Sequence, residues 1–335
     1  MENELISIIM PVKNAGLYLE DCIISIQGQT EQNWELIAVN DCSTDNSEDI
    51  LNWFSAVDER IQYIKNKGSG IIDALKCGYA LSHGNLIHRM DADDLMLPEK
   101  LALLKDKLQQ QGKGTIATGK VEYFAAEGVN EGYLNYQNWL NNLCETNSHW
   151  KELFKECVIA SPNWLMYRSD FEKCGAFNSE IYPEDYDLVF RMYKAGLKVA
   201  GLDAITHLWR DHKERSSRND EKYAACTFFE IKLRYFLSLK YNSNRPLLVW
   251  GAGKKGKDLA KKLQALEIPF TWVSNNPKKH GKEIYDQLME SFESIATKDS
   301  PQIIITVALK NAKSEIIEFL EKLNLEEGQN FFFFS

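Results

Sequence analysis

Short apolar runs alternate with amphipathic stretches along the first 110 residues. The apolar runs at residues 5–10, 34–39, 61–64 and 86–88 predict buried strands. Between and after them, residues 15–28, 71–81 and 98–110 carry apolar side chains at helical spacing, and a polar run at residues 40–47 leads into a further helix around Phe54. Strands of about five residues alternating with helices of about twelve indicate βαβ units. The predicted fold class is therefore α/β, with an open and mostly parallel sheet.

The pattern continues less regularly to about residue 240. Residues 115–124 predict one or two strands, residues 133–157 a helix, and residues 161–171 a returning strand. Residues 183–196 predict a compact helix that begins at Pro183, has acids in its first turn and ends at Gly196.

A second domain is predicted after the polar stretch at residues 241–246. Beyond it come a strand, a glycine-rich turn and a helix (residues 247–263), then strands at 270–275, 302–309 and 330–334. This order predicts a smaller Rossmann-like α/β domain. The expected organisation is a first domain at 1–221, a linking helix at 222–244 and an accessory domain at 245–335.

Composition and charge exclude several classes of protein. The 335 residues carry a net charge of −9, and residues 245–335 contribute 13 Lys and Arg against 12 Asp and Glu, so the acidity lies in the rest. We expect no nucleic-acid binding, which needs a basic face. No apolar stretch approaches 18 residues, and the N-terminus has no cationic segment, so neither a membrane span nor a signal peptide is expected. Seven cysteines without CxxC pairs indicate free thiols in the cytoplasm and no zinc site.

The clearest candidate chemistry is the segment Arg-Met-Asp-Ala-Asp-Asp, residues 89–94. Its three carboxylates follow a predicted strand, at the sheet edge where open α/β folds bind ligands. Carboxylates this close together need a cation or several hydrogen-bond donors. Hard oxygen ligands suit Mg²⁺ or Mn²⁺, with substrate phosphates completing the shell. Two alternatives stay open: a solvated acidic loop that caps the helix near Pro98, and neutralisation of the cluster by Arg89.

Five sequence blocks, in order, resemble the family 2 glycosyltransferases of GT-A fold. They are IIMPVKN (8–14), ELIAVNDCSTDNS (35–47), GIIDALKCGYALSHGNLI (70–87), MDADD (90–94) and YPEDYDLVFRMYKAG (182–196). A weaker sixth block is WRDHKERSS (209–217). Together they extend over about 70% of the chain. Departures from the usual pattern are Asn40 and Cys42, where the family commonly has Asp and Gly, and Leu75-Lys76 in place of an Arg-Asn pair.

The resemblance implies inverting transfer of a sugar, most often from a UDP-sugar, with Mn²⁺ or Mg²⁺ as cofactor. Asp185 matches the family's catalytic base, and Asp41 matches the acceptor for the N3–H of uracil, which would select uridine or thymidine over cytidine. The implied nucleotide-sugar contacts are Pro11, Val12, Asn14, Asp41, Gly70, Asp73, Asp91 and Ala92. The implied metal ligands are Asp91, Asp93 and His212, and the implied acceptor contacts are Glu184, Trp164 and Arg210.

Each of these roles has a structural alternative. Asp41 could cap the helix that follows it, and Asp185 could serve only the dipole of its helix. His212 could be an ordinary surface or core histidine. Trp164 is as typical of a buried core aromatic as of an acceptor pocket.

Other functions compete with sugar transfer. GAGKKG at residues 251–256 fits the dinucleotide-binding pattern, which would favour an NAD(P)-dependent oxidoreductase. However, Ser274 and Asn275 stand where ribose binding requires an acid. We therefore prefer an accessory module for assembly or for positioning the acceptor. A non-catalytic sugar-nucleotide-binding protein would need a broken motif, and a nucleotidyltransferase would need a glycine-rich basic loop after the first strand.

The expected partners are a nucleotide sugar and a glycan or lipid-linked glycan acceptor in bacterial surface-polysaccharide or lipid-linked oligosaccharide synthesis. Residues 222–241 are aromatic and carry Lys222, Lys232, Arg234 and Lys240, so this helix could lie on the inner face of a membrane. Such helices more often pack in a core or between domains. The sequence leaves open whether the chain forms a homo-oligomer.

Overall fold

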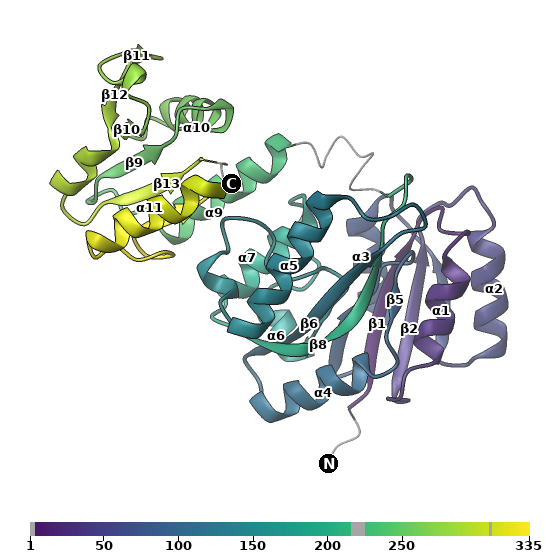
Figure 1. The fold of residues 1–335 in the computed structure, drawn as a ribbon. Helices are drawn as coiled ribbons and strands as arrows, with labels where there is room; N and C mark the ends of the chain where they lie inside the picture. Colours follow the sequence, from purple (N-terminus) through teal and green to yellow (C-terminus); the bar gives the residue numbers. More distant parts are fainter. Residues whose placement is uncertain (1–3, 216–224, 308–309) are drawn as a thin grey trace. The chain divides into compact units, whose positions relative to one another are not determined.

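Two compact units make up the chain in the computed structural model, which describes residues 4–215, 225–307 and 310–335. The first unit comprises residues 1–149 and 158–227, and the second comprises residues 150–157 and 228–335. Each unit has its own sheet (Figure 1). The helix expected at 222–241 is observed as α9 (Ala225–Leu239), and the preceding residues 216–224, which include Lys222 and the end of the WRDHKERSS block, lie outside the described part.

The first unit is built on a sheet of eight strands in the order β3-β2-β1-β4-β7-β6-β8-β5. Their bounds are β1 Ile6–Val12, β2 Trp34–Asn40, β3 Ile61–Lys65, β4 Leu86–Arg89, β5 Leu95–Met96, β6 Thr115–Phe124, β7 Trp164–Tyr167 and β8 Lys198–Arg210. Strands β1 to β4 pair in parallel, while β7 runs antiparallel to both of its neighbours. This mixed α/β sheet agrees with the predicted GT-A fold.

Helices cover the sheet of the first unit (Figure 1). They are α1 Leu19–Gln27, α2 Ser47–Val57, α3 Ile71–Leu81, α4 Lys100–Gln111, α5 Glu131–Thr146, α6 Arg168–Lys173 and α7 Glu184–Lys194, with a 3₁₀ turn at His149–Lys151. The central strands are buried on both faces, since consecutive residues, which point to opposite faces, are both buried in β1 (Ile8 and Ile9) and in β2 (Leu36 and Ile37). That burial explains why these strands read as continuous apolar runs.

Two predictions about secondary structure need correction, and one strand was not predicted. The helix expected at 133–157 ends at Thr146, because Asn147 adopts a left-handed conformation (φ 51°) that stops it. The strand expected at 161–171 covers only β7 and then turns into the helix α6. The sequence analysis did not anticipate β8, which is 13 residues long and pairs in parallel with β6.

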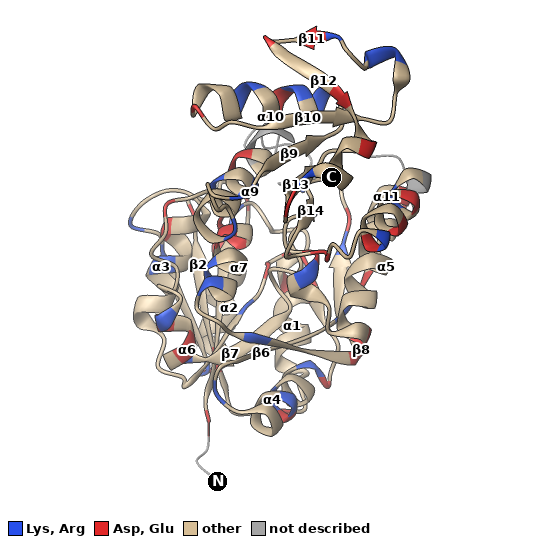
Figure 2. Cartoon of the chain, turned by 90° about the vertical axis from the view of Figure 1, so that its left-hand side faces the viewer, with Lys and Arg blue, Asp and Glu red and all other residues tan. Residues whose placement is uncertain are grey.

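The second unit contains six strands in the order β11-β12-β10-β9-β13-β14. They are β9 Leu247–Trp250, β10 Thr271–Ser274, β11 Glu283–Ile284, β12 Gln287–Ser291, β13 Gln302–Ile305 and β14 Phe331–Phe333. Helices α9, α10 (Lys254–Ala265) and α11 (Lys310–Lys322) accompany them, with 3₁₀ turns at Pro277–Lys279 and Phe292–Thr297. Five strands are parallel, and the chain winds outward from β9 in both directions, as in a Rossmann-like domain. Lysines dominate the charge on α10 (Figure 2).

An aromatic cluster holds the second unit together and includes a segment from the middle of the chain. Phe154, from residues 150–157, stacks on Phe334 with ring centroids 5.7 Å apart and also contacts Phe236 and Phe332. The buried Lys232 of α9 donates to the carbonyl of Lys155 at 2.6 Å. Residues 150–157 are therefore part of this domain's core, which the sequence analysis did not foresee.

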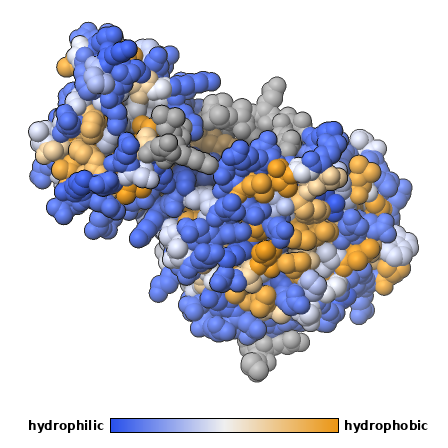
Figure 3. All heavy atoms as spheres, in the orientation of Figure 1, coloured by the Kyte–Doolittle hydropathy of each residue, from blue (hydrophilic) through white to orange (hydrophobic). Residues whose placement is uncertain are grey.

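The surface carries apolar side chains among polar ones (Figure 3). The most exposed large ones on or beside α1 and α2 are Leu17, Ile24, Trp53 and Val57. Among the described residues, none of the helices combines the length and the apolar character needed to cross a bilayer.

Candidate active site

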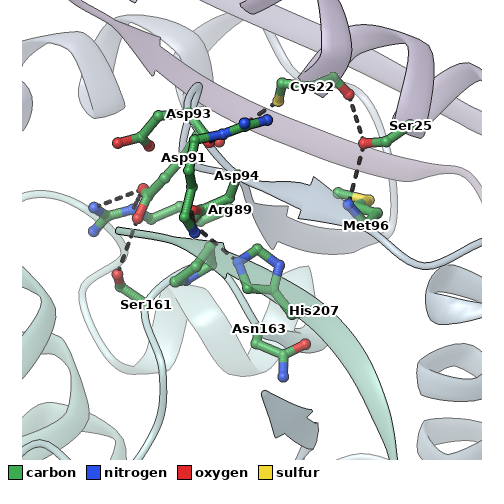
Figure 4. A network of polar contacts seen from close by, with 12 residues as sticks. Cys22, Ser25, Arg89, Asp91, Asp93, Asp94, Met96, Ser161, Asn163 and His207 are labelled. Carbon is green, nitrogen blue, oxygen red and sulfur yellow. Dashed lines mark hydrogen bonds and ion pairs between the residues drawn. The ribbon is translucent and has the colours of Figure 1, made fainter. Parts of the chain in front are cut away.

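The acidic loop at residues 90–94 leaves the carboxyl end of β4 in the middle of the large sheet, and its carboxylates point in different directions (Figure 4). Asp91 accepts a hydrogen bond from Nε of Arg89 at 3.1 Å and one from Oγ of Ser161 at 3.4 Å. Asp94 turns the other way and is 1% exposed. The loop therefore divides into an outward-facing pair, Asp91 and Asp93, and one inward-facing anchor.

Asp93 faces His212, as the resemblance implies for two ligands of one metal. Its Oδ2 lies 2.8 Å from Nε2 of His212, while its backbone carbonyl accepts from Nε of Arg210 at 2.8 Å. The hydrogen bond to Asp93 raises the pKa of His212 above its usual value. Burial alone would raise the pKa of Asp93, but the hydrogen bond from His212 and the charge of Arg215 hold it below its usual value. The carboxylate of Asp93 and the imidazole of His212 are therefore in direct contact beside the acidic loop.

The donor set fits a divalent cation that is completed by substrate. Within residues 4–215, 225–307 and 310–335, no three His, Cys, Asp or Glu side chains converge into a full metal cage. Asp91, Asp93 and His212 nevertheless offer oxygen and nitrogen donors at one loop. Mg²⁺ and Mn²⁺ commonly take one or two carboxylates and fill the remaining positions with water and phosphate oxygens. Arg89 binds Asp91 and so partly neutralises the cluster, which is the arrangement that one alternative in the sequence analysis supposed.

The predicted base, Asp185, follows Glu184, and Arg89 connects Glu184 to the acidic loop. Nη1 of Arg89 donates to Oε1 of Glu184 at 3.0 Å, and the same guanidinium also binds Asp91, so one cation joins β4 to the first turn of α7. Asp185 is half-buried next to Glu184, and its Oδ1 accepts from the backbone N–H of Tyr186 at 2.7 Å. Burial, with the negative charge of Glu184 beside it, raises the pKa of Asp185 to about 7.

Asp41 lies buried at the end of β2, in a nest of donors. Its Oδ1 accepts from Nδ2 of Asn66 at 2.7 Å and from the backbone N–H of Gly70 at 2.9 Å, while Oδ2 faces Nζ of Lys13 at 3.3 Å. Burial would raise the pKa of Asp41, but these hydrogen bonds and the Lys13 charge keep it below its usual value. Asp41 is not the N-cap of α2: that position is Asn46, whose side chain makes no capping bond. The helix-cap alternative is therefore wrong.

The remaining predicted nucleotide contacts surround Asp41 or follow the acidic loop. Val12 accepts from the backbone N–H of Asp41 at 2.7 Å, and Asn14 accepts from the N–H of Thr44 at 2.8 Å, so the ends of β1 and β2 are tied together. Pro11 lies within β1. Position 70 favours glycine, because its φ of +90° is a conformation that other residues rarely adopt. Asp73 accepts from the N–H of Ser69 at 3.1 Å, and Ala92 is buried between the two outward acids.

Two predicted acceptor contacts have mainly structural surroundings. Trp164 is 2% exposed and packs against Phe171 with ring centroids 5.6 Å apart, which matches the buried-aromatic alternative. Arg210 stacks over Tyr18, binds Asp21 at 3.3 Å and braces the backbone of Asp93, so it supports the loop. Glu184 has one carboxylate oxygen, Oε2, that is buried and has no hydrogen-bond partner among the described residues.

Sequence reasoning missed three residues around the acidic loop, Ser161, Lys100 and His207, and it named Asp94 only as a member of the acidic cluster. Lys100 and His207 are fully buried, 107 positions apart in sequence and 2.9 Å apart in space. The available signals were a lysine on the apolar side of α4 and a histidine inside a run of alternating apolar residues.

The first unit is thus an α/β domain with an acidic loop at its sheet edge and a carboxylate nearby, and comparison with known proteins identifies its family. The model of glycosyl transferase family 2 matches residues 7–175, about half of the chain, and the chain belongs to that family. The Glu-Asp block and His212 lie beyond the matched residues.

Known relatives and structures agree with this assignment. Glycosyltransferase GlyG of Streptococcus pneumoniae is 32% identical over 62% of this chain and 71% of its own length. TarS of S. aureus, solved in complex with UDP, matches with a TM-score of 0.52 and 15% identity, covering 71% of this chain and 67% of its own. Mannosyltransferase PcManGT of Pyrobaculum calidifontis, solved with GDP-Man and Mn²⁺, matches with a TM-score of 0.54 and 15% identity over 69% and 64% of the two chains. At this identity the two structures support the fold alone.

Proposed function

We propose that this glycosyltransferase is inverting and metal-dependent, and that it moves a sugar from a UDP-sugar to an acceptor hydroxyl. The observation that carries the proposal is the position of Arg89, whose guanidinium contacts both Asp91 of the acidic loop and Glu184 beside Asp185. The candidate diphosphate site and the candidate base are thus held together by one side chain, although 94 positions separate Asp91 from Asp185 in sequence.

In the proposed reaction the leaving group is a nucleoside diphosphate whose negative charge must be neutralised. Asp91, Asp93 and His212 would hold Mn²⁺ or Mg²⁺ at the diphosphate. The bound cation would supply Lewis-acid stabilisation of the departing oxygens. The close pairing of Asp93 with His212 supports this role, because cation binding would replace an existing contact without moving the backbone.

The second half of the reaction is deprotonation of the acceptor alcohol. Asp185 would take this proton while the hydroxyl oxygen attacks the anomeric carbon and the diphosphate leaves from the opposite side, which inverts the configuration. A carboxylate whose pKa is raised to about 7 is suited to act as a base near neutral pH. The orphaned oxygen of Glu184 would accept a hydrogen bond from the acceptor sugar.

Specificity for uridine would come from Asp41. Its Oδ2 faces Nζ of Lys13 at 3.3 Å, and that lysine side chain is 60% exposed and free to withdraw. The backbone N–H of Gly70 also approaches Oδ2, at 3.0 Å, and would stay in place. The N3–H of uracil could then donate to the same oxygen, whereas cytosine has no proton at N3. Because a fold neighbour holds GDP-Man, the fold does not choose the base, and the proposal depends on Asp41.

The wider setting follows the family resemblance: synthesis of a bacterial surface polysaccharide or lipid-linked oligosaccharide by a cytoplasmic enzyme. Lys232 of α9 is buried, which favours a core position for this helix over a membrane surface. The acceptor would be a glycan or a lipid-linked glycan. The NAD(P)-oxidoreductase alternative gains no support, since Ser274 and Asn275 remain where an acid is required. A non-catalytic sugar-nucleotide-binding protein is also disfavoured, because the acidic loop and Asp185 are both intact.

Thermal-shift measurements with UDP, GDP and CDP, each with and without Mn²⁺, test the proposal. We expect a rise in melting temperature with UDP that depends on Mn²⁺ and a clearly smaller rise with CDP, since a ligand that binds the native state stabilises it by mass action. Equal shifts for all three nucleotides would contradict the role of Asp41. The lack of any metal effect would contradict the role of Asp91, Asp93 and His212.

A further inference from the structure

Three buried polar side chains form a connected row beneath the acidic loop. Nε2 of His207 lies 3.1 Å from Oδ2 of Asp94, and Nδ1 of His207 lies 2.9 Å from Nζ of Lys100 (Figure 4 shows His207 and Asp94). All three are at most 1% exposed. Burying three ionisable side chains costs free energy unless each has hydrogen-bond or ionic partners, so their burial here requires an explanation.

The row continues to the loop at residues 161–162. Nζ of Lys100 also donates to the carbonyl oxygen of Pro162 at 2.6 Å. The preceding residue, Ser161, donates to Oδ2 of Asp91 at 3.4 Å. The contacts therefore close into a ring: Asp91 to Ser161, through Pro162 to Lys100 and His207, and back through Asp94 to the acidic loop.

The loop that carries Ser161 is fixed from its other side as well. Nδ2 of Asn163 donates to the carbonyl of Gly119 at 2.7 Å, and Oδ1 accepts from Thr206 at 2.8 Å. Oδ1 of Asp94, the oxygen that His207 leaves free, accepts from the backbone N–H of Arg210 at 2.8 Å. Both ends of the row are thus attached to backbone that borders the candidate metal site.

We propose that Lys100 and His207 are positioning residues, which set the geometry of Asp91 and Asp93 through Asp94 and the Pro162 carbonyl and thereby tune metal affinity. This inference rests on the proposed metal-dependent function. It assigns no contact between either residue and the substrate. Partners that orient a metal's ligands from behind typically change affinity or activity by about 10–100-fold when they are removed.

The ring also defines what His207 must be chemically. Burial lowers the pKa of Lys100 to about 7, so below that pH it is an ammonium and can only donate. In that form Nδ1 of His207 accepts from Lys100, and Nε2–H of His207 donates to Asp94. A glutamine has one acceptor and one donor group and can bridge the same neighbours. A leucine has the size but can bridge neither, and would leave Asp94 and Lys100 buried without this partner.

The experiment compares His207→Gln, His207→Leu and Lys100→Met with the wild type, using titration calorimetry of Mn²⁺ in the presence of saturating UDP. Lys105→Met is the matched control, because Lys105 lies on the same helix and is ion-paired with Glu31 at 2.6 Å. We expect Mn²⁺ affinity to fall about 10–100-fold in His207→Leu and Lys100→Met. His207→Gln and Lys105→Met should stay within about threefold of the wild type, and the melting temperature of each variant records any general loss of stability.

The outcomes separate this inference from the proposed function. If the wild type binds no Mn²⁺ with UDP, the proposed function fails. If the wild type binds Mn²⁺ and both His207→Leu and Lys100→Met bind it equally well, the positioning role is overturned while the function stands. It is also overturned if Lys105→Met loses as much affinity as Lys100→Met at the same loss of melting temperature, since the effect would then be general.

Discussion

In both sheets of this protein, loops follow the carboxyl ends of parallel strands, but the residues at these ends differ. We call these ends the first edge in the first unit and the second edge in the second unit. In the first unit, the parallel strands β2 and β4 lead into Asp41 and the acidic loop at residues 90–94. In the second unit, the parallel strands β9, β10 and β13 lead into Gly251, Asn275 and Thr306. Carboxylates that need partners mark the first edge, whereas small and neutral residues mark the second. The strand–turn–helix pattern alone therefore does not indicate a ligand site.

Three backbone carbonyls at the second edge have hydrogen-bond partners within the domain. Nε1 of Trp272 donates to the carbonyl of Gly251 at 2.8 Å, and Nζ of Lys279 donates to that of Ala252 at 2.7 Å. The carbonyl of Ser274 lies 2.8 Å from Nε2 of His280. Carbonyls of the glycine-rich turn thus already have donors. At the first edge, by contrast, Asp91 and Asp93 are held by side chains that a cation could replace.

Among the variants that test the difference between the two edges, we expect Asp185→Asn to have the largest effect, a loss of turnover. Loss of the base should lower kcat by about 10²–10⁴-fold, because an amide cannot accept the acceptor proton. UDP and Mn²⁺ binding should stay near the wild-type values, since Asp185 lies on α7 and outside the acidic loop. Turnover in the presence of UDP-sugar and acceptor, with calorimetry of UDP, measures the two quantities.

Asp187→Asn serves as the control for that variant. Asp187 is on the same helix turn, but it is buried and paired with Nε of Arg191 at 2.7 Å. Its replacement should reduce stability and leave kcat within a few-fold of the wild type. Near-normal turnover of Asp185→Asn would contradict the proposed mechanism.

In the second unit the corresponding large effect should be on stability. Phe236 is fully buried and packs against Phe154, Phe332 and Phe334, so Phe236→Ala should cost about 3–5 kcal/mol. Hydrogen exchange should accelerate in β14 and in residues 150–157 more than in β1 and β2. Equal acceleration in all of these elements would mean that the two units unfold as one.

Much of the first edge was predictable because its signals are local in sequence. Asp41, Asp91 and Asp93 follow apolar strands directly, and a short motif is enough to mark each of them. His212 was harder to assign, and only the folded chain brings it to 2.8 Å from Asp93, 119 positions away.

What could not be predicted depends on distant partners. Lys100 lies on the apolar side of its predicted helix, but nothing near it in sequence indicates that Pro162 and His207 are its partners. Residues 150–157 read as the end of a helix, because nothing nearby shows that Phe154 completes the core of another domain. A single sequence contains the residues that form such contacts, but it does not show which of them are in contact in the folded chain.

A smaller effect is expected at the uridine end of the site. Asp41→Asn replaces a charged acceptor by a neutral one, so UDP affinity should fall about tenfold. The discrimination against CDP should narrow as well, because the amide can rotate and donate to N3 of cytosine. Competition between the two nucleotides measures both changes, with Glu48→Gln, a surface acid paired with Lys65, as the control. An unchanged UDP-to-CDP ratio would show that Asp41 does not read the base.

The pH dependence of the transfer reaction should come from Asp185. Since burial and Glu184 raise the pKa of Asp185 to about 7, the base is increasingly protonated, and inactive, below that pH. The value of kcat/KM, which reports on the free enzyme, should therefore fall about fourfold between pH 8 and pH 6.5. Removing the charge with Glu184→Gln should move this limb to lower pH. A flat profile down to pH 5 would exclude a base with this pKa.

The smallest expected effect is at the second edge, where NADH and NADPH should cause no change in melting temperature at millimolar concentration. The acid that would bind the ribose is absent, since Ser274 and Asn275 stand at that position. The positive control is UDP with Mn²⁺ in the same assay, which reports on the first edge. A shift with NADH that is lost in Gly253→Asp would overturn the contrast between the two edges, because it would show that the turn binds a dinucleotide without its acid.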